Sequence, residues 1–133
     1  MKVCFHFENF DADVSSGTMH SMQQWYELLL AFNVEEVAVV NLTDFNIPYI
    51  SSDTTTHVYP SLEAFLADNP EGVKTYIDKG GEDYKTYDFS ETDWLIFGPS
   101  NGLPQADVQI NTGLHALYPR EAAAIILAKA TWQ

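Results

Sequence analysis

The sequence is poor in positive charge. Its 133 residues include 19 acidic and only six basic side chains, for a formal net charge of −13. Lys2 is the only base before Lys74. A protein that binds nucleic acid unaided normally carries a basic face that neutralises phosphates. The composition therefore disfavours unaided RNA binding and leaves open a local basic patch, a basic protein partner or a saline environment.

Cysteine and long apolar runs are also scarce. Cys4 is the single cysteine, which excludes an internal disulfide and favours a reducing, cytoplasmic location. No apolar run approaches the roughly 18 residues that a membrane-spanning helix needs. No basic segment precedes an apolar one at the N-terminus, as it would in a signal peptide. The sequence thus predicts no contact with a membrane.

No metal site and no phosphate cradle are expected. The histidines are scattered, and none has metal-ligand spacing with Cys4. They are His6, His20, His57 and His115. Gly80-Gly81 lacks the Gly-Lys-Ser/Thr pattern of a phosphate-binding loop. The acidic residues of the first loop, Asp11 and Asp13, are most simply explained as solvated charges.

The apolar residues predict one α/β domain over residues 1–133. Their share is 46%, enough for a single core in a chain of this length. Strands are expected where β-branched and aromatic residues cluster, at 2–7, 36–41, 73–77, 94–97 and 108–110, with a short one near 57–59. Helical spacing of apolar residues predicts helices at 18–32, 61–67 and 119–131. This alternation indicates a mostly parallel sheet flanked by helices.

The last predicted helix is apolar on every side from Ala122 to Ala128. A helix of this kind is buried, either in the core of its own chain or against a second subunit. Trp132, close to the end of the chain, could contribute to the same interface.

The most informative stretch is residues 93–104. The apolar run Trp94–Phe97 has the pattern of a buried parallel strand, and it stops at Gly98-Pro99. Gly102 follows and allows a positive φ angle or a close approach of the backbone to another group. Ligands of α/β proteins bind beyond the carboxyl ends of the strands, so this loop is a candidate site. An ordinary strand-to-helix turn is the alternative.

The segment from Phe97 to Pro104, Phe-Gly-Pro-Ser-Asn-Gly-Leu-Pro, resembles the Phe-Gly-Pro-Glu-x-x-Gly-Leu-Pro loop of the SPOUT superfamily. The closest resemblance is to its SpoU branch, which methylates ribose 2′-oxygens of tRNA. Residues 73–80 resemble the strand and Thr-Lys-Gly loop of that family, and 117–130 resemble its closing segment. The match extends from about residue 57 to the end and implies a SPOUT-like α/β fold with a C-terminal trefoil knot.

The resemblance also implies a cofactor, a partner and a reaction. The cofactor would be S-adenosylmethionine, held largely through the backbone of three loops, and no metal would be needed. The cofactor-binding residues would be Ile77, Asp78, Gly80, Gly98, Pro99, Gly102, Ile110 and Leu117. The chain would pair as a homodimer through the knot region and transfer a methyl group to a tRNA-like RNA.

Several family side chains are replaced. Ser100 stands where the family has Glu, in a loop one residue shorter, and Glu27 stands near the place of a helix Arg that handles RNA. Arg120 and Ser100 are therefore the candidate catalytic side chains. The sequence leaves open a divergent, weakly active or inactive methyltransferase and a non-catalytic knotted dimer that binds a cofactor or a protein. A third reading is a small α/β domain with an accidental resemblance.

Overall fold

A computed structural model describes residues 1–8, 16–42, 54–99, 101–110 and 119–132. The strands form one six-stranded sheet in the order β3-β2-β1-β5-β4-β6, and every pairing is parallel. They are β1 (Lys2–Phe7), β2 (Glu36–Asn41), β3 (Thr55–Tyr59), β4 (Lys74–Asp83), β5 (Trp94–Phe97) and β6 (Val108–Gln109). The helices are α1 (Ser16–Ala31), α2 (Leu62–Asp68) and α3 (Pro119–Trp132). The predicted parallel α/β sheet flanked by helices is confirmed.

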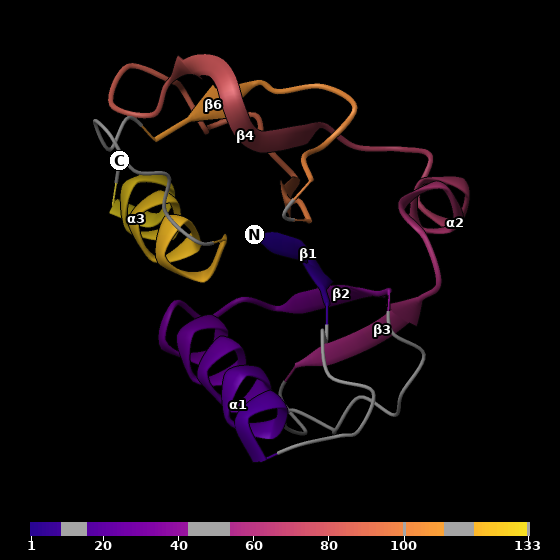
Figure 1. The fold of residues 1–133 in the computed structure, drawn as a ribbon. Coiled ribbons are helices and arrows are strands. Elements are labelled where there is room, and N and C mark those ends of the chain that lie inside the picture. The colour runs from indigo at the N-terminus through magenta and orange to yellow at the C-terminus, as the bar shows by residue number, and fades with distance from the viewer. Residues whose placement is uncertain (9–15, 43–53, 100, 111–118, 133) are drawn as a thin grey trace.

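The sheet separates two layers of helix. In Figure 1, α1 and α3 lie on one side of the strands and α2 lies on the other. The central strands β1 and β5 are buried on both faces along nearly their whole length. Because helices cover both faces, these strands consist almost entirely of apolar residues and do not alternate apolar with polar ones.

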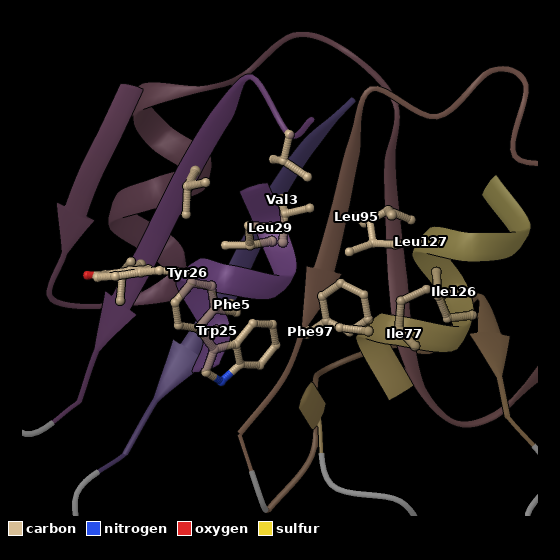
Figure 2. Packing of buried hydrophobic residues seen from close by; sticks show 14 of the residues in the cluster. Val3, Phe5, Trp25, Tyr26, Leu29, Ile77, Leu95, Phe97, Ile126 and Leu127 are labelled. Carbon is tan, nitrogen blue, oxygen red and sulfur yellow. The ribbon is translucent and has the colours of Figure 1, made fainter. Parts of the chain in front are cut away.

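The α1 and α3 side holds the larger core. The ring of Trp25, on α1, stacks on Phe5 with centroids 4.2 Å apart, and it lies 6.2 Å from the ring of Phe97. Ile126 and Leu127 of α3 are fully buried against the same face of the sheet. Figure 2 shows these side chains meeting beneath the end of β5. The end of β5 is thereby fixed from the α1 side.

The α2 side is smaller. Phe65 of α2 meets the ring of Trp94 edge to face, with centroids 4.9 Å apart. Ser61 caps the helix, because its Oγ accepts the Ala64 N–H at 3.1 Å. Cys4 is fully buried in this layer, and burial raises the pKa of its thiol. It packs as a small apolar residue.

One predicted boundary is wrong. The strand expected to end at residue 77 continues as β4 to Asp83. Ile77 and Glu82 both pair with Val108, so residues 78–81 form a bulge. Gly81 permits it, because a Cβ there would lie 2.5 Å from the Asp107 carbonyl carbon. A glycine pair reads as a strand end in sequence, although glycine equally allows a bulge with close backbone contact.

Three further expectations can be compared only with the described residues. The trefoil knot depends on the path of residues 111–118, which lie outside them. Within the described ranges, no helix is long and apolar enough to cross a membrane. The same ranges contain no group of three or more histidine, cysteine or acidic residues placed to hold a metal ion.

Candidate functional site

The candidate site lies at the carboxyl end of β5, beside the bulge of β4. Ile77 pairs with Phe97 in the parallel register, so the β4 bulge that begins at Asp78 lies beside Gly98, the first residue after β5. The bulge and the loop after β5 both lie at the level of the carboxyl end of β5. Parallel α/β sheets bind their ligands beyond the carboxyl ends of the strands. The resemblance implied that these two segments lie together, and the strand register places them side by side.

The loop after β5 is closed by its own backbone. The Gly102 N–H donates to the Pro99 carbonyl oxygen at 3.0 Å, and Gly102 has a φ of 96°. Gly98 is buried directly beneath the side chain of Leu103, whose Cγ a Cβ on Gly98 would strike. Glycine is therefore required at both positions, at Gly98 for space and at Gly102 for conformation.

Asp78 joins the two loops. Its Oδ2 accepts the Leu103 N–H at 2.5 Å and its Oδ1 accepts the Lys79 N–H at 2.8 Å. The Cβ that Gly102 lacks would lie 3.3 Å from the same Oδ2. Hydrogen bonds from backbone N–H groups to a carboxylate are stronger than neutral ones. The Asp78 side chain thus holds the β5 loop against the β4 bulge, and within the described residues both of its hydrogen bonds go to the protein's own backbone.

Asp107 and Gln109 hold the other flank of the bulge, and sequence reasoning missed both. Asp107 Oδ2 accepts the Tyr76 N–H at 2.8 Å. The Gln109 side-chain amide donates to the Gly81 carbonyl at 2.7 Å and accepts the Gly80 N–H at 3.5 Å. The sequence carried a signal for them, because these two polar side chains flank the buried Val108 of a short strand. In that position they can bond to backbone groups of the neighbouring strand.

Gly80 is the open position of the bulge. Its φ is 90°, and a Cβ built on it would meet no heavy atom of the described structure within 4 Å. Between Asp78 and Gln109, the space beside the Gly80 Cα is therefore unoccupied by any described residue. A segment of this kind can approach a ligand through its backbone groups.

A buried histidine lies under the same edge. Nδ1 of His6, on β1, is 2.8 Å from the carbonyl oxygen of Phe97, the last residue of β5. Burial lowers the pKa of His6, while the bond to Phe97 and the charges of Glu8 and Glu63 oppose that shift. Sequence analysis treated His6 only as a scattered histidine. Its place between Phe5 and Phe7 in a buried strand was the available signal.

Of the remaining predicted residues, Ile77 directly precedes Asp78, and the others lie apart from these loops or outside the described ranges. Ile77 is buried and Ile110 half-buried in the α3-side core, so their backbones alone are available. Arg120 forms an ion pair with Glu121, with 3.1 Å between Nη2 and Oε1. No contact among the described residues joins Arg120 to the β4 or β5 loops. Ser100, Leu117 and His115 lie outside the described residues.

No protein-family model matches the sequence, and no curated protein matches it. Solved structures do. A candidate RNA methyltransferase from Bacillus anthracis has a TM-score of 0.72 and 18% identity, over 97% of this chain and 91% of its own. The SpoU methyltransferase AviRb from Streptomyces viridochromogenes, in complex with AdoMet, has a TM-score of 0.67 and 16% identity. The match covers 99% of this chain and 59% of AviRb.

A third similar structure is the TrmH/SpoU tRNA-modifying enzyme of A. aeolicus. Its TM-score is 0.67 at 13% identity, over 100% of this chain and 74% of its own. The chain therefore has the α/β fold of the SpoU and TrmH methyltransferases, and the predicted resemblance is confirmed at the level of the fold. It spans 59% of the length of AviRb and nearly the whole of the B. anthracis protein.

Proposed function

We propose that this chain is a divergent SPOUT-class protein that binds S-adenosylmethionine at the carboxyl ends of β4, β5 and β6. The supporting observation is that Asp78 joins the β4 bulge to the loop after β5, beside Gly80, where a Cβ would meet no heavy atom of the described residues within 4 Å. Side chains contribute little to this surface. Recognition through backbone groups tolerates the side-chain replacements that separate this chain from its structural neighbours.

The reaction we propose is methyl transfer to an RNA hydroxyl or base. The structural neighbours include RNA methyltransferases, and one of them holds AdoMet. The cofactor supplies an electrophilic methyl group when bound. The chain would contribute position, because holding the sulfonium and the acceptor in line removes much of the entropic cost of the reaction. Ser100 and Arg120 are the polar side chains proposed to assist.

We further propose that the chain forms a homodimer through its C-terminal region. One side of α3 is only half-buried, at Ala124, Ile125 and Ala128, although it is apolar. Trp132 is 75% exposed, and its ring lies 5.6 Å from that of Phe32 on the turn after α1. An exposed apolar surface of this kind favours a partner. Sedimentation equilibrium tests it, because a mass near the 15.0 kDa of one chain would contradict the dimer.

The charge of the chain favours a second candidate, a non-catalytic dimer that binds a cofactor or a protein. Arg120 is paired with Glu121, so its guanidinium is not free for an acceptor hydroxyl. The Glu27 side chain is exposed on α1 and would repel a phosphate. With a net charge of −13, RNA binding needs positive charge from a partner.

Calorimetric titration with S-adenosylmethionine and S-adenosylhomocysteine tests the cofactor proposal, with adenosine as the control ligand. Saturable binding of the first two and weak or no binding of adenosine is the expected result. No heat at millimolar ligand, with the protein folded by circular dichroism, would refute cofactor binding. Incorporation of labelled methyl groups into total RNA then separates the enzyme from the binding module.

A further inference from the structure

His6 is a buried polar side chain to which the proposed function gives no role. It is 9% exposed on β1, a strand whose neighbouring residues Phe5 and Phe7 are apolar and buried. Side chains alternate along a strand, so His6 shares the α2 side of the sheet with Cys4. An aliphatic side chain of similar volume would bury more apolar surface here. Packing alone therefore does not account for an imidazole at this position.

Within the described residues, the imidazole makes one hydrogen bond. His6 Nδ1 lies 2.8 Å from the Phe97 carbonyl oxygen, and a carbonyl oxygen can only accept a hydrogen bond. Nδ1 must therefore carry the hydrogen, which fixes the tautomer of the neutral ring. Burial lowers the pKa of His6, so the neutral ring predominates at pH 7.

The acceptor, the Phe97 carbonyl, lies where β5 ends and the candidate loop begins. Phe97 ends β5, and its carbonyl belongs to the peptide group that joins it to Gly98. The ring of Phe97 is packed near Trp25 from the α1 side, and its carbonyl is held by His6 from β1. Figure 2 shows Phe97 and Trp25 at this strand end. Glycine imposes no backbone direction of its own, so the Phe97–Gly98 peptide sets the direction in which the loop leaves the sheet.

We infer that His6 is a positioning residue, whose Nδ1–H bond to Phe97 fixes the described loop residues 98, 99 and 101–103 for their ligand. The inference rests on the proposed function only for what the ligand is. The ordering of the loop itself can be measured without any ligand.

The experiment compares His6→Leu with His6→Asn. The asparagine amide nitrogen can take the place of Nδ1 and donate to Phe97, whereas leucine cannot. The amides of Gly102 and Leu103, which close the loop, report its ordering by hydrogen exchange. We expect exchange about tenfold faster in His6→Leu and close to wild type in His6→Asn, as the loss of one hydrogen bond predicts.

The opposite end of the sheet provides an internal control. The Val73 amide, just before the start of β4 and far from the loop, donates to Asp93 at 2.7 Å. Its exchange should be equal in all three proteins. Affinity for S-adenosylmethionine should fall about tenfold in His6→Leu and return in His6→Asn. A merely structural histidine would give no such selective rescue.

The outcomes separate this inference from the proposed function. Equal exchange of Gly102 and Leu103 in all three proteins would overturn the positioning role, as would a failure of His6→Asn to restore it. Altered exchange without any cofactor binding would support the positioning role and refute the cofactor. If His6→Leu does not fold, imidazole ¹⁵N shifts of the wild type decide, because a ring protonated at Nε2 alone is incompatible with the bond.

Discussion

Two turns at opposite ends of the sheet are built alike. Gly72, before β4, has a φ of 88°, and Gly102, after β5, has a φ of 96°. A Cβ on the first would lie 3.1 Å from Asp93 Oδ2, and one on the second 3.3 Å from Asp78 Oδ2. Each of these carboxylates also accepts a backbone N–H. The same local device therefore occurs at the amino and the carboxyl ends.

Their surroundings differ. At the amino end, the Lys74 ammonium donates to the carbonyl oxygens of Glu71 and Gly72, at 2.6 and 3.4 Å. At the carboxyl end, the turn adjoins a buried Gly98 and the open backbone of Gly80. A glycine turn with a carboxylate is thus a structural device in itself. It becomes a candidate site where the neighbouring backbone is left available at the ligand-binding edge.

The largest effect is expected from Gly98→Val. Its side chain must displace Leu103, which should lower the free energy of unfolding by about 1–3 kcal/mol and move the loop. Affinity for S-adenosylmethionine should fall more than about tenfold if the loop contributes one or more backbone hydrogen bonds. Urea denaturation and calorimetry measure the two quantities. Wild-type affinity in a folded Gly98→Val protein would place the ligand elsewhere.

An intermediate effect distinguishes the paired turns. Gly102→Ala and Gly72→Ala each impose a positive φ on alanine, at a cost of about 1–2 kcal/mol in the free energy of unfolding. Because the two sites are matched in φ and in carboxylate distance, their stability losses should be similar. Only Gly102→Ala should weaken cofactor binding, by about tenfold if one backbone contact is lost. Equal affinities of the two variants would contradict a functional difference between the ends.

The smallest effect is a dependence on pH. The folded pKa of His6 lies below its ordinary value of 6.5, so the unfolded chain binds the proton first as the pH falls. Neutral His6 makes its full contribution to the free energy of unfolding above about pH 6.5. That contribution is lost as the pH falls toward the lowered folded pKa. His6→Asn should therefore show a flatter loss of stability between about pH 7 and 5. Parallel urea midpoints for the two proteins across that range would exclude this linkage.

The elements of the carboxyl edge were predictable because their causes are local. The run Trp94–Phe97 predicts a buried strand, and Gly98-Pro99 predicts its end, since apolar periodicity and glycine act within a few residues. Ser61 predicts the start of α2 for the same reason. The end of β4 was misread because Gly80-Gly81 allows a strand end and a bulge equally well. Pairing with a strand about 30 residues further on selected the bulge.

The sequence by itself determined the strands, the helices and the glycines that permit tight turns, because these depend on side chains close to one another along the chain. Only the tertiary structure decided that Asp78 holds Leu103, 25 residues away, and that His6 holds Phe97, 91 residues away. Such bonds depend on the order of strands in the sheet, which places β1 beside β5 and β5 beside β4. Local pattern does not encode that order, because parallel neighbours are joined through crossovers rather than through adjacent sequence.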